Sequence, residues 1–383
     1  MARRGACSPG RRAGVLPVDA PDAGARDAGM QPAGVGCAVT ADPPAAPSAP
    51  PAGDRLVAPT HDLPAHDIPL ARELEELAHR AWPPLREERL GGWVLRESGG
   101  SSRRGNSVWA RGDVDDLDAA LAQVRSFYAA AGLPATFQIT PLSRPAGLAA
   151  ALDRAGFDDS GPTDVCVADL AGLRSAAAAA QAAAADADGV NGAGGRAGAP
   201  VAVELLERAE PDERWLAVAG EVLSTFAAQR AGTLAVLRRT PLPQCYVTVL
   251  VDGRPLGVGR GVRDGDWLGI YSMATLPAAR GRGIARRVLA ALADWAAAGG
   301  ASRAYLQVEQ TSTAARGLYA DLGFRPVYRY RYRRLSVPPP VPADLGEGPG
   351  TSPGAGPGTS PGAGPGAGLG EGLGEGLGEG GVR

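Results

Sequence analysis

Four arginines and two glycines stand between an apolar run and a helical pattern in ATLPAARGRGIARRVLAAL, residues 274–292. A helix leaves its first backbone N–H groups without intrahelical partners, and its dipole adds partial positive charge at the same end. Gly281 and Gly283 have no Cβ, so a ligand can approach this backbone closely. The stretch therefore predicts a phosphate-binding loop, with Arg280, Arg282 and Arg286 as supporting charges. The alternative is a solvated turn.

Two common phosphate loops do not fit this stretch. The chain has no GxxxxGK[ST], and GxGxxG fails because Arg286 stands at its last position. The run from Arg280 to Ala285 does follow the pattern Arg or Gln, two residues, Gly, one residue, Gly or Ala. This pattern resembles the acetyl-CoA signature of the GNAT N-acetyltransferase superfamily, and residues 273–324 resemble the superfamily's motifs A and B.

The resemblance implies an acyltransferase that moves an acetyl group from acetyl-CoA to a primary amine by direct attack in a ternary complex. It implies that the pantetheine arm lies along the end of one strand and that the pyrophosphate lies on the N–H groups of the loop. The expected cofactor-binding residues are Met273, Ala274, Thr275, Arg280, Gly281, Arg282, Gly283, Ile284, Ala285 and Arg286. No metal is expected.

Two further side chains are expected to take part in the chemistry. Tyr319 stands where the superfamily places a tyrosine, five residues before Phe324, and a phenol can give a proton to the departing thiolate. Glu309, at the end of a predicted strand, is the candidate general base, directly or through water. The alternatives are a packed aromatic ring and a solvated charge. Ser312 departs from the superfamily, because many members have Asn there.

The elements that must position these residues lie in a block from 200 to 336. Residues 201–205 alternate as a strand, and residues 211–230 have the pattern of a helix. Three β-rich runs follow in residues 244–276, separated by Asp252-Gly253 and Asp264-Gly265, which are strong hairpin signals. A helix from about 283 to 298, a short strand, a second helix and the strand FRPVYRYRYRRL complete the block. Its alternating Tyr and Arg residues fit an ordinary last strand or the lining of a cleft for an acidic acceptor.

An earlier block, 67–170, repeats this order in degenerate form. Residues 127–157 align with 295–324 with a single gap, and strands GGWVLRES and NSVWARG precede a helix from about 114 to 130. Leu152 stands where the later block has Tyr319, and ARGDVDDLDAAL replaces the arginine loop. Its aspartates would repel a pyrophosphate, so this block is expected to pack against the catalytic half and shape the acceptor cleft. The segment SSRRGNSVW is either a substrate contact or a hairpin turn.

The predicted fold is therefore α/β (α+β), the GNAT acyl-CoA N-acyltransferase fold. It has a mixed, mostly antiparallel sheet flanked by helices, preceded by a smaller GNAT-like α/β half. The remaining segments are biased in composition: a Pro/Ala/Gly-rich leader at 1–66, an Ala/Gly-rich linker at 171–199 and a Gly/Pro tail at 337–383. The leader and the tail are expected to be disordered.

Composition disfavours several classes of protein. The formal charge is −2 over 383 residues, which disfavours a nucleic-acid-binding module. Four cysteines without CxxC spacing predict neither a disulfide framework nor a zinc site. No apolar run has the length of a signal peptide or of a membrane span, so a cytoplasmic location without membrane contact is expected. The leading hypothesis is an enzyme that acts on a small-molecule or protein amine. The alternative is a non-catalytic acyl-CoA sensor or scaffold.

Overall fold

The computed structural model describes residues 63–191 and 203–335. Apart from residues 63–66, the predicted disordered leader lies outside these ranges. The predicted tail at 337–383 and the end of the predicted linker lie outside them as well. All the described residues fall in one compact unit, Pro50–Arg383.

The first part of the chain contains four helices and five strands within the described ranges. They are α1 (Ile68–Ala81), β1 (Arg86–Leu90), β2 (Trp93–Glu97), β3 (Val108–Ala110), α2 (Leu117–Ala130), β4 (Thr136–Ile139), α3 (Leu148–Arg154), β5 (Phe157–Asp169) and α4 (Leu170–Asn191). The predicted strand, strand, helix, strand, helix order of the degenerate half is present. The sequence did not predict α1 or the 13-residue length of β5.

The second part follows the predicted order closely. Its elements are β6 (Val203–Arg208), α5 (Glu213–Val222), α6 (Ser224–Ala228), α7 (Arg230–Arg239), β7 (Gln244–Val251), β8 (Arg254–Asp264), β9 (Trp267–Thr275), α8 (Ile284–Ala298), β10 (Arg303–Glu309), α9 (Thr313–Asp321) and β11 (Arg325–Leu335). The single helix predicted at 211–230 is instead divided, because the backbone of Leu223 is extended and ends α5.

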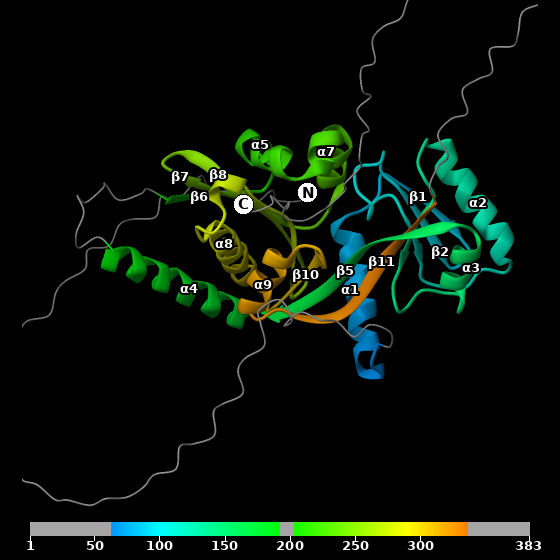
Figure 1. The fold of residues 1–383 in the computed structure, drawn as a ribbon, viewed down its shortest axis with the longest axis horizontal. Coiled ribbons are helices and arrows are strands. Elements are labelled where there is room, and N and C mark those ends of the chain that lie inside the picture. Colours follow the sequence, from blue (N-terminus) through cyan, green and yellow to red (C-terminus); the bar gives the residue numbers. More distant parts are fainter. Residues whose placement is uncertain (1–62, 192–202, 336–383) are drawn as a thin grey trace, which may run out of the picture. The chain divides into compact units, whose positions relative to one another are not determined.

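All eleven described strands form one sheet, in the order β1-β2-β3-β4-β11-β5-β10-β9-β8-β7-β6. Only the pairs β3/β4 and β9/β10 are parallel, so the predicted mixed, mostly antiparallel sheet is confirmed. Strand β5 of the first part lies between β10 and β11 of the second, and β11 in turn pairs with β4 (Figure 1). The two predicted blocks are therefore not separate folded units, because they exchange strands.

The alternating arginines of β11 tie it to the first part of the chain. Arg329 donates to Asp164 at 2.8 Å and Arg331 to Asp159 at 2.6 Å, both on β5, while Arg333 donates to Asp153. The intervening Tyr330 and Tyr332 are buried. The arginines of this strand thus bind its neighbours, which favours the interpretation of an ordinary strand over that of a cleft lining.

Helix α8 packs unusually close to the sheet because its neighbour β8 presents three glycines on one face. A Cβ on Gly259 would lie 2.5 Å from Val288 Cγ1 of α8, and a Cβ on Gly257 would collide with Ile284. At Gly261 the nearest atom would be Leu292 Cδ2 at 3.0 Å. The sequence GVGRG in β8 is therefore a helix-docking surface.

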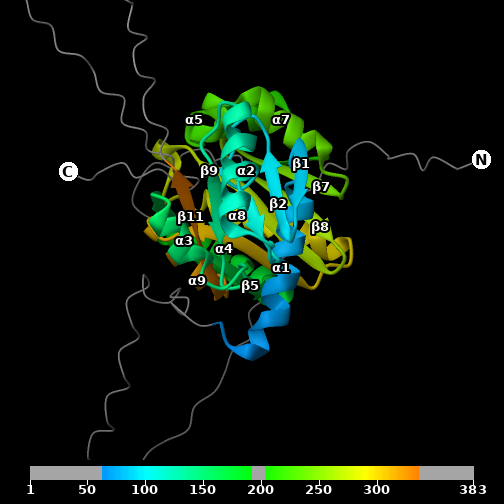
Figure 2. The same cartoon turned by 90° about the vertical axis from the view of Figure 1, so that its right-hand side faces the viewer.

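Two apolar clusters cover opposite faces of this half of the sheet. One contains α8, α9 and α4; the other contains α1, α5 and α6. A third cluster lies under α2, which covers β2 to β4 (Figure 2).

The prediction of a linker starting at residue 171 is wrong for its first part, because helix α4 begins at Leu170. Its first turns pack against α8, and Leu173 and Ala177 are fully buried in the same cluster as α8. The alanine run therefore serves as a packed helix where it follows β5.

Candidate active site

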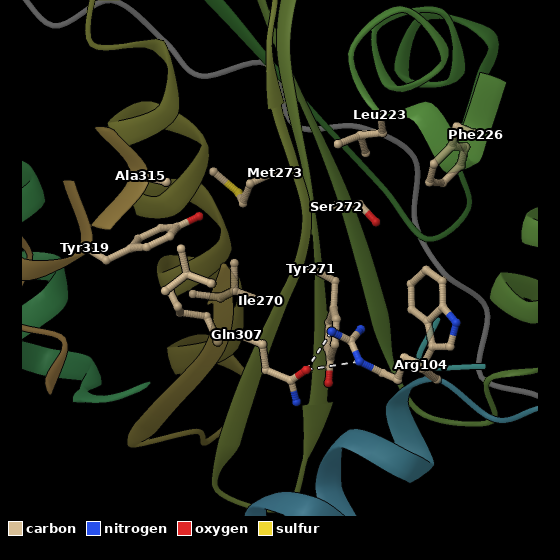
Figure 3. Close-up of a pocket in the computed structure, with 13 residues that line it drawn as sticks. Arg104, Leu223, Phe226, Ile270, Tyr271, Ser272, Met273, Gln307, Ala315 and Tyr319 are labelled. Atoms are coloured by element: carbon tan, nitrogen blue, oxygen red, sulfur yellow. Dashed lines mark hydrogen bonds between the residues drawn. The ribbon is translucent and has the colours of Figure 1, made fainter. Parts of the chain in front are cut away.

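Strands β9 and β10 separate in the middle of the sheet. They pair only between Trp267 and Ile270 on β9 and between Arg303 and Leu306 on β10. Beyond this point β9 bulges: two residues, Ser272 and Met273, oppose Gly259 of β8, and Ser272 adopts a positive φ of 50°. The bulge turns β9 away from β10 and opens a cavity of about 90 Å³ between them (Figure 3).

The cavity draws its walls from both halves of the chain. Its lining residues are Trp82, Arg104, Leu223, Phe226, Ile270, Tyr271, Ser272, Met273, Leu306, Gln307, Val308, Ala315 and Tyr319. Of the residues predicted from the sequence, the structure brings Met273 and Tyr319 together here.

The end of β9 has an edge that could accept an extended ligand. Ala274 and Thr275 pair with β8 on one side, and within the described residues no strand pairs with them on the other. Both residues are buried, so their backbone groups are what this edge offers to an extended ligand. The Thr275 Oγ1 atom is buried and has no hydrogen-bond partner in the described part of the chain.

The arginine loop has the backbone expected of an anion site. Gly281 and Gly283 have φ values of 75° and 72°, which disfavour other residues, and a Cβ on either would meet open space. Helix α8 starts at Ile284 without a side-chain cap. The first helical hydrogen bond of α8 runs from Arg287 N–H to the Gly283 carbonyl and is 3.2 Å long. The N–H groups of Ile284, Ala285 and Arg286 come before it in the chain. They are the unpaired donors of a helix start.

The side chains of the loop contribute less than the sequence suggests. Ile284 is buried in the core, so only its backbone can bind a ligand. Arg286 donates to Asp321 of α9 at 3.0 Å, which holds its guanidinium against a neighbouring helix. Arg282 is exposed. The residues 280–286 lie outside the lining of the cavity.

Tyr319 on α9 points its hydroxyl into the cavity (Figure 3). Its ring lies edge-on to Phe324, with 5.8 Å between the ring centroids. Burial raises the pKa of the phenol well above its usual range, because the charged phenolate would lose its hydration. Tyr319 therefore keeps its proton at neutral pH and can act as a donor.

Glu309 is not brought to Tyr319. It ends β10 on the opposite face of the sheet and forms a hydrogen-bonded ion pair with Arg103 from the loop after β2. It borders a smaller pocket with Gln307 and Tyr330, and this pocket adjoins the cavity because Arg104 and Gln307 line both. The Glu309 carboxylate is held by the Arg103 guanidinium and lies on the opposite face of the sheet from Tyr319, so its position favours a structural role.

Two residues that line the cavity, Trp82 and Arg104, come from the first part of the chain, and the sequence did not predict them as site residues. Arg104 enters the cavity from the segment SSRRGNSVW, which is the long, buried polar loop of the hairpin between the antiparallel strands β2 and β3. Asn106 holds that loop: its Oδ1 accepts from the N–H groups of Ser98 at 2.7 Å and Gly100 at 3.0 Å. The available signal was a short run of Ser, Arg, Gly and Asn between two strands. The predicted hairpin is confirmed by the pairing of β2 with β3, and the substrate contact stays a prediction.

Ser312 stands at the N-cap of α9, but its side chain makes no capping hydrogen bond. It is nevertheless buried. This chain therefore has Ser where many superfamily members have Asn, and the serine hydroxyl does not cap the helix.

Metal sites and membrane spans can be judged for the described residues. In the described ranges no group of three or more His, Cys, Asp or Glu side chains is arranged to hold a metal ion. Among the helices of those ranges, none combines the length and apolar character needed to cross a bilayer.

Comparison with known proteins gives the family. Residues 70–333 match the family model described as "Probable histone acetyltransferase Rv0428c C-terminal". The chain is 27% identical over 263 residues to "Uncharacterized N-acetyltransferase YobR" of Bacillus subtilis (strain 168), covering 68% of this chain and 97% of that protein.

The chain is also similar to solved structures. A GCN5-related N-acetyltransferase from Kribbella flavida is 19% identical, with a TM-score of 0.48, covering 69% of this chain and 94% of that one. A tandem GNAT protein from the clavulanic acid biosynthesis pathway is 14% identical, with a TM-score of 0.43, covering 68% of this chain and 87% of that one. Because the family model spans most of the chain, the chain belongs to the Rv0428c C-terminal family and is a GNAT N-acetyltransferase.

Proposed function

We propose that the protein transfers an acetyl group from acetyl-CoA to a primary amine by direct attack within a ternary complex. The observation that carries this proposal is the gap between β9 and β10, where the protonated hydroxyl of Tyr319 faces a cavity lined by residues from both faces of the sheet. When bound, acetyl-CoA supplies an activated acyl thioester.

The residues present fit this cosubstrate. The N–H groups at the start of α8 and the open positions above Gly281 and Gly283 suit a pyrophosphate. The unpaired edge of β9 from Met273 to Thr275 suits a pantetheine arm, and Thr275 Oγ1 is a buried group that lacks a partner in the described residues. Arg280 and Arg282 add positive charge beside the loop.

Tyr319 acts as the acid in this mechanism. The amine nitrogen forms a bond to the acyl carbon while the carbon–sulfur bond breaks, and the amine proton goes to solvent water. Tyr319 Oη gives its proton to the leaving sulfur and takes one back from solvent, which closes the cycle. The mechanism assigns no direct proton transfer to Glu309, because this residue is not part of the cavity lining and is paired with Arg103.

Both acceptor classes, small-molecule and protein amines, fit this chemistry. The name of the matched family refers to a histone acetyltransferase, which makes a protein lysine one candidate. The cavity is small and lies between strands, which favours a small molecule. A cytoplasmic location and the absence of nucleic-acid and membrane partners stay predictions.

The Tyr319→Phe variant tests the mechanism. Release of free CoA thiol is measured with a panel of amines, and kcat is expected to fall about 100-fold or more with the KM for acetyl-CoA unchanged, because only the proton donor is lost. The matched control is Tyr128→Phe, which removes a buried hydroxyl bonded to the Arg96 carbonyl at 2.9 Å, far from the cavity in the cluster under α2.

The outcomes separate the enzyme from a non-catalytic acyl-CoA sensor. An unchanged kcat in Tyr319→Phe removes this residue as the acid. Binding of acetyl-CoA to the wild-type protein without thiol release for any amine supports the sensor.

A further inference from the structure

The face of the cavity opposite Tyr319 has its own chemical character. Tyr319 belongs to the cluster with Ile270, Leu306 and Val308, whereas Trp82, Leu223, Phe226 and Tyr271 belong to the cluster on the other face of the sheet. We call this second group, together with Arg104 and Gln307, the acceptor wall. It lies across the β9/β10 gap from Tyr319 (Figure 3).

A buried cation lines the acceptor wall. Arg104 is only 8% exposed, and its Nη2 and Nε donate to Gln307 Oε1 at 2.6 and 3.1 Å (Figure 3). Its guanidinium carbon lies 5.7 Å from the ring centroid of Trp82 and 5.4 Å from that of Tyr271. The hydrogen bonds and the rings fix the guanidinium at the edge of the cavity.

A second cation lies behind the same rings. Arg260 of β8 is fully buried, 5.4 Å from the Trp82 centroid and 5.5 Å from the Tyr271 centroid. Its hydrogen bonds go to neutral acceptors: Gln244 Oε1, the Ala81 carbonyl and Thr240 Oγ1. Within the described residues no carboxylate lies within ion-pair distance of it, and its Nη1 is buried without a partner.

The acceptor wall therefore holds positive charge without acidic residues. None of the thirteen described residues that line the cavity is Asp, Glu or His. Glu309 lines the adjoining pocket with Arg104 and Gln307 and is paired with Arg103, so one carboxylate stands against the guanidinium groups of Arg103, Arg104 and Arg260. In a buried site such a charge pattern repels an ammonium ion and attracts an anion.

We propose that the acceptor is a small amine that carries a carboxylate beside an aromatic or apolar body, as an aromatic α-amino acid does, with its carboxylate held at Arg104. This assignment rests on the proposed acetyl transfer and deepens it. The rings of Trp82, Phe226 and Tyr271 contact the apolar body, and Arg104 orients the carboxylate by a charge-assisted hydrogen bond.

The same charges explain how the site works without a base. Two guanidinium groups disfavour the ammonium form of the acceptor near the wall, so the amine sheds its proton to solvent on binding. A polycationic acceptor would be repelled by the same wall. The pattern thus selects against cationic amines as well as for carboxylates.

The first test compares acceptors that differ by one group. With the full-length protein, phenylalanine is expected to show a kcat/KM about 10- to 100-fold above that of phenylalanine amide and of phenethylamine, with the difference in KM. In Arg104→Gln this preference collapses to near unity. In Arg331→Gln, which removes an exposed arginine paired with Asp159 away from the cavity, the preference is retained.

The second test needs no turnover. Calorimetry with 3-phenylpropionate, which has the body and the carboxylate but no amine, is expected to show binding that weakens about 10-fold or more in Arg104→Gln. Phenethylamine is expected to bind the wild-type protein more weakly than 3-phenylpropionate.

The outcomes distinguish the two proposals. Transfer to phenethylamine or a polycationic amine with equal or higher kcat/KM than to phenylalanine overturns the acceptor assignment and leaves acetyl transfer standing. Binding of 3-phenylpropionate with no transfer to any amine contradicts the proposed function while supporting the anion site. No binding of 3-phenylpropionate to the wild-type protein overturns the anion site.

Discussion

At the scale of single residues, His79 on α1 gives the protein a built-in sensitivity to acid. Its ring lies against Trp109, with 5.0 Å between centroids, and its Nε2 is 3.2 Å from the Glu87 carboxylate. Burial, helped by Arg96 and other nearby arginines, lowers the pKa of the imidazole to about 4. Burial thus outweighs the attraction of Glu87.

The pH dependence of stability follows from this shift. In the unfolded chain the imidazole takes up a proton below about pH 6.5, whereas the folded protein keeps His79 neutral until about pH 4. The unfolded state therefore gains protons first as the pH falls. The free energy of unfolding is expected to drop by about 1 kcal/mol between pH 7.5 and pH 5.5, and by about 3 kcal/mol in all by pH 4.

Urea unfolding of His79→Gln at pH 7.5 and pH 5.5 checks this prediction. The variant is expected to lose less stability between the two pH values than the wild type, whereas His66→Gln, with an exposed side chain, behaves as the wild type. The comparison isolates His79 from groups such as buried Glu75, whose raised pKa acts in the opposite direction. Equal acid sensitivity in wild type and His79→Gln would contradict it.

The sequence predicted those site residues whose role is carried by the backbone or by a local motif. Gly281 and Gly283 lie at a helix start with the required dihedral angles, and Tyr319 faces the cavity. Arg104 could not be predicted as a wall residue. Its place in the cavity depends on contact between a loop of the first part and β10, about 200 positions apart in the sequence, which no local pattern encodes.

At the scale of elements, the contact between β8 and α8 depends on missing side chains. Gly259→Ala would place a Cβ 2.5 Å from Val288 Cγ1 and 2.7 Å from Met273 Sδ. Val288 is fully buried in α8, so the helix must shift or the core must strain. We expect a loss of about 1 to 3 kcal/mol in the free energy of unfolding. Because Met273 lines the cavity, weaker binding of acetyl-CoA is expected as well.

Gly220→Ala in α5 is the matched control. A Cβ there meets nothing within 4 Å and the backbone is helical, so a gain of up to about 1 kcal/mol is expected. Chemical denaturation of both variants provides the measurement. Gly259→Ala with wild-type stability would show that α8 does not depend on the glycine face.

Element type was more predictable than element extent. The Asp-Gly turns at 252 and 264 correctly separated β7, β8 and β9, since such turns fix hairpins locally. The helix at 211–230 was predicted as continuous, yet the chain breaks at Leu223, whose side chain packs in the cluster with Trp215 and Phe226. Tertiary packing there outweighs helix propensity, and propensity was all that the sequence showed.

At the scale of the whole molecule, the exchange of strands joins the two halves into one folding unit. β5 pairs with β10 along seven residue pairs, from Asp169 opposite Arg303 to Thr163 opposite Glu309. On its other side β5 pairs with β11. The internal similarity of the two halves correctly indicated related folds, but it could not show that each half completes its sheet with a strand of the other.

The exchange predicts that the block from 200 to 336, although it carries Tyr319 and the arginine loop, does not fold alone. Without β5, strands β10 and β11 lose their common neighbour, and the aspartates that pair with Arg329 and Arg331 are gone. Two unpaired strand edges with buried tyrosines would then face solvent. The fragment is expected to be aggregated or unfolded by circular dichroism, with no thiol release.

A cleavage site placed between residues 192 and 202 gives the matching experiment on an otherwise intact chain. After cleavage the two fragments are expected to co-elute on size exclusion, because β5 stays inserted between β10 and β11, and to keep the acetyl-transfer rate of the uncut protein. Denaturing and separating the fragments should abolish that rate, and mixing them again should restore it. A fragment 200–336 that unfolds cooperatively and transfers acetyl groups by itself would show that the inserted strand is dispensable.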